Sequence, residues 1–315
     1  MSTRLTAALL LSLVVSCQGG INASPPKPAD FHADRAFEHA KKLVAFGPRP
    51  SGSDAIAKTQ AYIEDELKSY GLNVSEDAFT ATTPKGQIAM KNIIGHVEGS
   101  KPGIVIVSGH YDTKLQPGFL GANDGASSAA TVLELARVFA KSKPEYSLWF
   151  VFFDGEEAVE DWSAMNGEDN TYGSRHMAAK MKADGTLNRV KALVLVDMIG
   201  DKQLNIKREG ESTPWMVELF WNTAKASGYE KAFVKQEQFI SDDHLPFRDA
   251  GVPVLDLIDF DYGPQHSYWH TNDDTLDKIS GESMKTVGDV IILTMPELFK
   301  RLNNPSAQAK KPDVQ

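Results

Sequence analysis

Residues 148–157 read Leu-Trp-Phe-Val-Phe-Phe-Asp-Gly-Glu-Glu. The six apolar residues that open this stretch predict a strand buried on both faces. The two glutamates that close it, Glu156 and Glu157, would be costly to bury unless a partner compensates their charge. Because successive side chains diverge at a strand end, one glutamate can bind a metal while the other transfers protons. For this pair alone, a solvated turn is the alternative interpretation.

Other apolar runs predict further strands of the same kind. Strands are predicted at residues 91–97, 103–108, 147–153, 191–198 and 252–258. Helical periodicity predicts helices at residues 31–46, 54–70, 126–141, 174–183, 213–227 and 282–302. Strands without alternation that are separated by helices indicate an α/β fold, in which helices cover both faces of the sheet.

Polar side chains follow three of the predicted strands. His110 and Asp112 follow the second strand, Glu156 and Glu157 the third, and Asp197 ends the fourth. The loops after parallel strands lie along one edge of such a sheet, where α/β proteins place their sites. Each residue alone has an ordinary structural interpretation, but together they predict a shared site at this edge.

Two more residues are candidates for that site. Asp124 directly precedes Gly125 and the helix predicted from residue 126, so it could simply cap that helix. His270 lies in the polar loop 269–274, where a histidine is more often solvated or a simple hydrogen-bond partner.

Composition sets bounds on the class of protein. The chain has 315 residues, of which 42% are hydrophobic and 24% charged, and its formal charge is −9. Without a basic block, nucleic acid is excluded as an expected partner. Residues 30–303 contain no long linker or repeat and are predicted to be one catalytic domain, between a tether at 19–29 and a flexible tail at 304–315. The absence of heptads favours a monomer.

The N-terminus reads as a targeting segment rather than as part of the fold. Arg4 precedes an apolar stretch at residues 5–15 that is too short to span a bilayer, so residues 1–18 are predicted to be a signal peptide. Cys17, the only cysteine, follows Val-Val-Ser as in a bacterial lipobox. We therefore expect export to the periplasm or cell envelope, with a possible lipid anchor at Cys17. Ordinary cleavage nearby is the alternative.

At this point the chain resembles a known family. The motifs are Gly-His-Tyr-Asp at 109–112, Gly-Ala-Asn-Asp-Gly at 121–125, Asp-Gly-Glu-Glu at 154–157, Val-Asp at 196–197 and Trp-His-Thr at 269–271. Their order resembles that of the M28 clan of zinc aminopeptidases, whose fold the glutaminyl-peptide cyclotransferases (glutaminyl cyclases) share. The segment Phe-Gly-Pro-Arg-Pro-Ser-Gly-Ser at 46–53 is also typical of the clan. The resemblance implies a three-layer α/β/α sandwich with a central mixed, largely parallel sheet.

The resemblance also implies a zinc site. Asp124, Glu157 and His270 correspond to the zinc ligands, and three protein ligands leave the fourth position open, as a catalytic zinc needs. Glu156 would be the general acid and base beside the metal. The two glutamates would then have separate roles.

Two chemistries occur in the clan. In a two-zinc aminopeptidase, His110 and Asp197 would bind a second metal and Asp124 would bridge the two ions. A glutaminyl cyclase uses one zinc per chain and converts the N-terminal glutamine of a peptide or protein to pyroglutamate. His110 does not decide between them, because both branches carry it.

Three local features favour the cyclase. The segment after Glu157 is long and contains Trp162, residues 241–247 resemble the cyclase motif Asp-Asp-His-x-Pro-Phe, and Trp269 directly precedes His270. Each has an alternative: Trp162 could pack at the surface, Trp269 could belong to a peptidase pocket, and the two aspartates could cap a short helix.

The cyclase resemblance assigns the remaining roles. Asp197 would hold the substrate amide or leaving group, and Asp242 would complete a hydrogen-bonded network with it. Trp162 and Trp269 would wall the pocket, and His110 is grouped with them as substrate-binding. Gly125 after the ligand looks more like a peptidase. In the loop 259–268, Phe260 and Tyr268 are both candidates for a further aromatic position.

Overall fold

The computed structural model describes residues 27–162 and 168–304. Six strands among these residues form one sheet in the order β1-β2-β4-β3-β5-β8. Their bounds are β1 Asn73–Thr83, β2 Gly86–Val97, β3 Lys101–His110, β4 Tyr146–Phe153, β5 Val190–Asp197 and β8 Val254–Ile258. β1, β2 and β4 pair antiparallel, whereas β4, β3, β5 and β8 run parallel. The predicted mixed, largely parallel sheet is confirmed.

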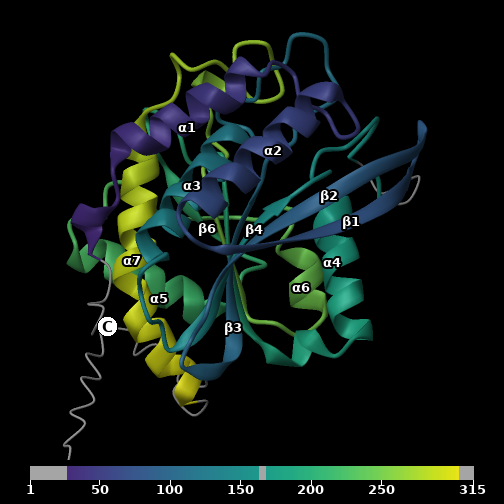
Figure 1. Ribbon diagram of the computed structural model, residues 1–315. Coiled ribbons are helices and arrows are strands. Elements are labelled where there is room, and N and C mark those ends of the chain that lie inside the picture. The colour runs from purple at the N-terminus through teal and green to yellow at the C-terminus, as the bar shows by residue number, and fades with distance from the viewer. Residues whose placement is uncertain (1–26, 163–167, 305–315) are drawn as a thin grey trace, which may run out of the picture.

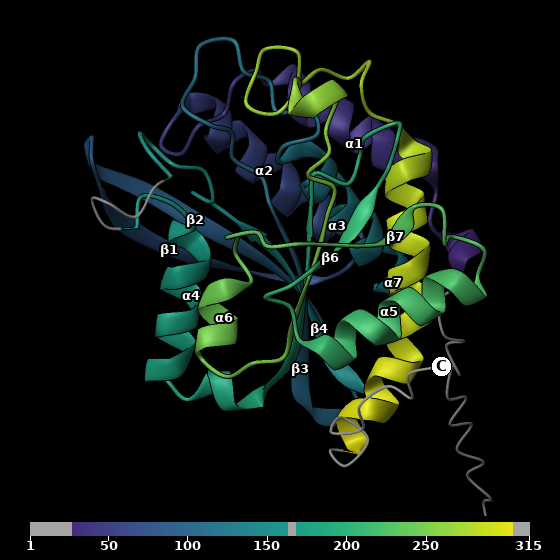
Figure 2. The same ribbon diagram turned by 180° about the vertical axis from the view of Figure 1, so that it is seen from behind.

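Helices cover both faces of this sheet (Figures 1 and 2). One face carries α1 (Ala33–Ala45), α2 (Asp54–Ser69), α3 (Ala126–Phe139), α5 (Pro214–Ala226) and α7 (Gly281–Asn303). The other carries α4 (Tyr172–Ala183) and α6 (Leu245–Asp249). Alternate residues of β3 enter the two layers: Val105 and Val107 pack toward α3, and Ile104 and Ile106 toward α4. This double burial explains the apolar runs and confirms the three-layer sandwich.

The predicted helices are all present, with ends that shift by a few residues. α2 ends as expected, because Gly71 adopts φ 85° and donates its N–H to Lys68 O at 3.0 Å. The edge strand β1 was not predicted, since its polar, half-exposed sequence lacks a buried run. The same holds for the short parallel pair β6 (Ile206–Glu209) and β7 (Phe233–Gln238).

The predicted signal peptide, Cys17 and nearly all of the C-terminal tail lie outside the described residues. Of the predicted tether, the end is described: Pro28–Asp30 form a 3-10 helix, and Lys285 Nζ donates to Pro28 O at 2.8 Å. Among residues 27–162 and 168–304, no helix is long and apolar enough to cross a membrane.

Candidate active site

The carboxyl ends of the parallel strands bring the predicted polar residues together. His110 ends β3, Asp197 ends β5, and the Glu156-Glu157 pair follows β4 after one turn. Asp124 comes from the loop before α3, and His270 from the loop between β8 and α7. All six side chains lie at the edge of the sheet where the sequence predicted a shared site.

Two groups of metal-ligating atoms meet at Asp124. In the first group, His270 Nε2 lies 3.4 Å from Asp124 Oδ2 and 3.3 Å from Glu157 Oε2. In the second, His110 Nε2 lies 3.2 Å from Asp124 Oδ1 and 3.1 Å from Asp197 Oδ1. Asp124 therefore presents one oxygen to each group.

The loop that carries Asp124 is fixed from behind by Asp274. The Asp274 carboxylate accepts the N–H groups of Asn123 at 2.7 Å and Asp124 at 3.1 Å, and the Tyr262 hydroxyl at 2.6 Å. Burial and the nearby Asp124 charge raise the pKa of Asp274 to about 6. Gly125 follows with φ 92°, and a Cβ there would lie 2.5 Å from Asp112 O. The turn into α3 therefore requires glycine.

Asp112 positions the two glutamates. Its Oδ1 accepts the Glu156 N–H at 3.2 Å, and its Oδ2 accepts the Glu157 N–H at 3.3 Å. Its Oδ1 also lies 3.4 Å from His110 Nδ1. One buried carboxylate thus connects the end of β3 to the turn after β4 and sets the direction of both glutamates.

Arg49, from the loop between α1 and α2, is completely buried beneath the site. Its guanidinium donates to the carbonyls of Tyr111 at 2.8 Å, Leu120 at 2.6 Å and Gly121 at 2.8 Å. Burial lowers the pKa of Arg49 to about 10, so that it remains charged. The Arg49 side chain holds both ends of the loop that precedes Asp124.

Buried carboxylates dominate the electrostatics. Burial, followed by the charges of Asp242 and Glu157, raises the pKa of Glu156 well above its usual range, although His110 opposes the shift. Burial and the charge of Asp197 likewise raise the pKa of Asp242. Asp242 Oδ2 has no hydrogen-bond partner within the described part of the chain. The protonated form of both acids is therefore favoured by their surroundings.

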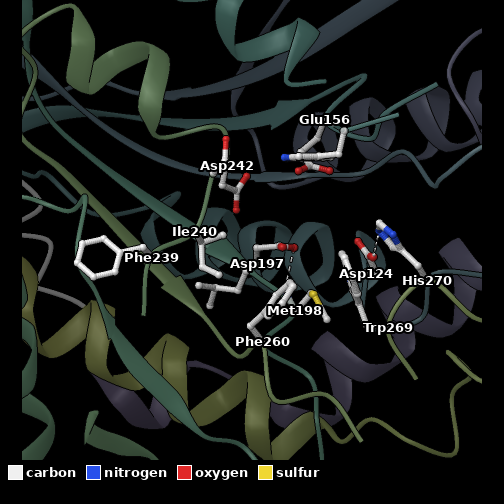
Figure 3. Close-up of a pocket in the computed structure, with 13 residues that line it drawn as sticks. Asp124, Glu156, Asp197, Met198, Phe239, Ile240, Asp242, Phe260, Trp269 and His270 are labelled. Atoms are coloured by element: carbon white, nitrogen blue, oxygen red, sulfur yellow. Dashed lines mark hydrogen bonds and ion pairs between the residues drawn. The ribbon is translucent and has the colours of Figure 1, made fainter. Parts of the chain in front are cut away.

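A cavity of about 310 Å³ opens onto these groups (Figure 3). Its polar lining combines Asp124, Glu156, Asp197, Ser241, Asp242 and His270, and its apolar lining Trp162, Met198, Phe239, Ile240, Ile258, Phe260 and Trp269. Trp269 stacks on His270 with ring centroids 4.1 Å apart, and Phe260 packs on Trp269 at 4.8 Å. The cavity is thus apolar with a few charged groups, as in small-ligand sites.

Two residues that line the cavity have strained backbones. Met198 and His270 adopt φ 50° and 53°, in the left-handed region that non-glycine residues rarely enter. Such strain accumulates at functional sites, where the surrounding structure holds it. Here it turns the chain sharply after Asp197 and at the histidine of the first metal-ligating group.

The structure brings together all nine residues predicted for the site, around the cavity or in its metal-ligating groups. His110 belongs to the second metal-ligating group but lies behind the cavity. His110 is 1% exposed and is not part of the cavity lining. Sequence reasoning placed Asp112 at the shared edge without a specific role, and it assigned no role to Asp274 or Arg49. Asp112 lies in the motif at 109–112 and Arg49 in the segment at 46–53. Their place in these motifs is the sequence signal that could have indicated a role in holding the site loops.

Comparison with known proteins identifies the family. The model of peptidase family M28 matches residues 92–295. A glutaminyl-peptide cyclotransferase of Drosophila melanogaster is 33% identical over 255 residues, which cover 72% of this chain and 70% of the fly protein. This chain belongs to peptidase family M28, on its glutaminyl-peptide cyclotransferase branch.

Solved structures agree with this assignment. The glutaminyl cyclase of an Acidobacteriales bacterium has a TM-score of 0.83 and 40% identity, over 90% of this chain and 99% of that chain. A leucine aminopeptidase precursor from Bacteroides thetaiotaomicron has a TM-score of 0.76 and 26% identity, over 86% of this chain and 98% of that chain. The fold itself therefore serves proteins named for either chemistry.

Zinc dependence is a property of this family, and the first metal-ligating group fits the ion. Both oxygens of Glu157 are buried, and among the residues that the structure describes Oε2 forms an ion pair with His270 Nε2 at 3.3 Å. Asp124, Glu157 and His270 offer two carboxylates and an imidazole, a donor set suited to catalytic zinc. A cation there would compensate the two buried charges.

Proposed function

We propose that this enzyme cyclises the N-terminal glutamine of peptides and proteins to pyroglutamate and releases ammonia. The observation that carries the proposal is the pairing of one metal-ligating group with an apolar cavity that also contains a protonatable glutamate. The cyclotransferase relatives support the same reaction.

Asp124, Glu157 and His270 would hold one zinc ion per chain. When bound, zinc polarises the side-chain carbonyl of the glutamine and stabilises negative charge on its oxygen. Trp269 and Phe260 form an apolar wall beside His270 that suits the methylene groups of that side chain. Trp162 lines the same cavity and would close it from the side of the segment that follows Glu157.

Glu156 would carry the proton. The α-amine nitrogen of the substrate attacks Cδ of its own side chain, so that a C–N bond forms within one residue. Glu156 accepts a proton from that nitrogen and returns it to the amide nitrogen, which leaves as ammonia when the Cδ–N bond breaks. Because both reacting groups belong to one residue, the enzyme has only to fold the substrate back and stabilise charge.

Asp197 and Asp242 would orient the nitrogen groups. Asp197 Oδ1 accepts the Met198 N–H at 2.8 Å and the Ser128 hydroxyl at 3.1 Å, so this carboxylate is already fixed. Asp242 lines the cavity, and its carboxyl group would interact with the substrate amine or amide. His110 lies behind Asp124 and Asp197, and we propose that it positions these two side chains instead of touching substrate.

Mass spectrometry tests the reaction directly. The zinc-loaded protein is incubated with a Gln-Ala-Ala peptide and a Leu-Ala-Ala peptide. We expect the first to lose the mass of ammonia and the second to stay intact. Release of free leucine or glutamine would refute the cyclase.

Substitution of Glu156 tests the proton transfer. Glu156→Gln keeps the shape of the side chain but cannot accept the proton, so kcat should fall by about 10²- to 10⁴-fold. Zinc content should stay unchanged, because Glu156 lies outside the ligand group. Glu160→Gln, in the partly exposed segment beyond the pair, is the matched control. Retained turnover in Glu156→Gln would exclude this role.

A two-zinc aminopeptidase is the second candidate. It is favoured by the second metal-ligating group, which consists of His110, Asp124 and Asp197. Asp124 belongs to both groups. Metal analysis of the purified protein separates the two: about one zinc per chain supports the cyclase, and two with leucine release support the peptidase.

The setting of the enzyme is proposed from the sequence. Residues 1–18 support export to the periplasm or cell envelope, and Cys17 supports a lipid anchor there. The substrates would then be exported peptides and proteins with N-terminal glutamine, and the enzyme would act as a monomer.

A further inference from the structure

Phe239 is an exposed aromatic residue at the rim of the active-site cavity. It directly follows β7, its exposed fraction is 70%, and it lines the same cavity as Glu156 and Trp269. Figure 3 shows Phe239 at the end of the cavity opposite Asp124 and His270. Single exposed apolar residues are common and need no function, so its surroundings decide the matter.

The ring of Phe239 rests on the backbone of Gly210. A Cβ at residue 210 would lie 2.3 Å from Cε1 of the ring and 2.7 Å from both Cδ1 and Cζ. Any side chain larger than hydrogen would therefore push the ring away. Glycine is therefore needed at residue 210 to make room for the ring. The backbone conformation does not itself require glycine, because residue 210 does not have a positive φ.

The backbone around Phe239 is held on both sides. Gly210 N–H donates to Gln238 O at 2.7 Å, and Ile240 N–H donates to Glu209 Oε1 at 3.2 Å. Glu209 is itself buried, and its other oxygen accepts the Ser212 hydroxyl at 2.8 Å. An aromatic surface that is ordered in advance loses little entropy when a ligand covers it.

The cavity has a direction under the proposed function. Its polar end, with Asp124 and His270, would take the side-chain amide of the N-terminal glutamine. The next residue of the peptide begins about 3.8 Å further along the chain. Phe239 and Ile240 provide apolar surface at the opposite end, where that next side chain would leave the cavity.

We propose that Phe239, supported by Gly210, is the subsite for the side chain of the residue after the N-terminal glutamine. It favours an aromatic or large aliphatic side chain at that second position. This inference rests on the proposed function and adds a substrate preference to it.

Paired substrates test the subsite. We compare kcat/KM for Gln-Phe-amide and Gln-Gly-amide in the zinc-loaded enzyme. The wild-type enzyme should prefer Gln-Phe-amide by about three- to tenfold, the range expected of one aromatic contact. Phe239→Ala should reduce this ratio to near one, because kcat/KM for Gln-Phe-amide falls more than kcat/KM for Gln-Gly-amide. Leu293→Ala, at an exposed apolar position on α7, is the matched control and should keep the ratio.

Gly210→Ala provides an independent variant. Its methyl group displaces the ring, so the ratio should fall although Phe239 is present. In the double variant Gly210→Ala/Phe239→Ala, the glycine change should have no further effect on the ratio, because the two residues act through one contact.

The possible outcomes distinguish a failure of the subsite from a failure of the proposed function. If both peptides are cyclised and Phe239→Ala leaves their ratio unchanged, the subsite is refuted and the cyclase stands. If the wild-type enzyme shows no preference, the subsite is likewise refuted. If no peptide is cyclised, the proposed function is refuted and the subsite falls with it.

Discussion

At the scale of single residues, the site is a set of buried acids that compete for protons. Burial raises the pKa of Glu156 and of Asp242, and the charge of Asp242 raises the pKa of Glu156 further. Two neighbouring buried carboxylates cannot both ionise easily, so they titrate as a pair. Glu156 must be ionised to act as a base, and its pKa is therefore tuned by the neighbouring acid Asp242.

Asp242→Asn should shift the pH profile. Glu156 accepts a proton in its ionised form, so kcat/KM rises with pH as Glu156 loses its proton. Removing the negative charge of Asp242 lowers the pKa of Glu156, and the acid limb of the profile should move to lower pH. The measurement is kcat/KM for a glutaminyl peptide between pH 5 and pH 9.

Asp249→Asn is the control for that shift. Asp249 ends the neighbouring helix α6 with 66% of its side chain exposed, so the limb should stay in place. An acid limb that moves to higher pH in Asp242→Asn would contradict the coupling between Asp242 and Glu156.

At the scale of elements, the site depends on loops that are tied to each other rather than on the strands alone. Arg49 reaches from the loop between α1 and α2 to three carbonyls in the loop after β3. Its planar guanidinium directs several N–H groups in fixed directions, which a lysine ammonium cannot reproduce. With lysine in place of Arg49, the three carbonyls would be buried without their hydrogen-bond donors.

Arg49→Lys should destabilise the fold and the metal site together. Each buried acceptor that loses its donor costs about 1–3 kcal/mol, so we expect a loss of about 3 kcal/mol in the free energy of unfolding. Urea denaturation measures that loss, and a zinc-chelator competition measures the accompanying fall in zinc affinity. Arg35→Lys, at a half-exposed ion pair with Glu134, should cost about 1 kcal/mol or less. Equal stability of the two variants would refute the role of Arg49.

The helices, the buried strands and the site edge could be predicted because they follow from local patterns. The apolar runs of β3 and β4 specify burial on both faces, and the acids that follow them specify the edge. The role of Arg49 could not be predicted, since its three partners lie more than 60 positions away. Phe239 was missed for a similar reason: its position depends on Gly210, across a pair of short strands that no pattern predicted.

At the scale of the whole molecule, buried acids oppose folding unless something neutralises them. Burial raises the pKa of Asp154 and of Asp243 to about 7. Burial alone would lower the pKa of His270, but hydrogen bonds and charges from Asp124 and Glu157 raise it to about 9. Both kinds of group therefore bind more protons in the folded state than in the unfolded state around neutral pH.

This surplus of bound protons predicts how metal-free protein responds to pH. Stability falls with rising pH wherever the folded state holds more protons, here from the unfolded aspartate pKa of about 4 up to the folded values. Metal-free protein should therefore melt at a lower temperature at pH 7.5 than at pH 5.5. Zinc takes the place of the His270 proton and binds more tightly as its ligands deprotonate. The melting temperature of zinc-loaded protein should therefore fall less between pH 5.5 and pH 7.5 than that of metal-free protein. Calorimetry measures both melting temperatures. A difference between zinc-loaded and metal-free protein that became smaller as pH rose would contradict this prediction.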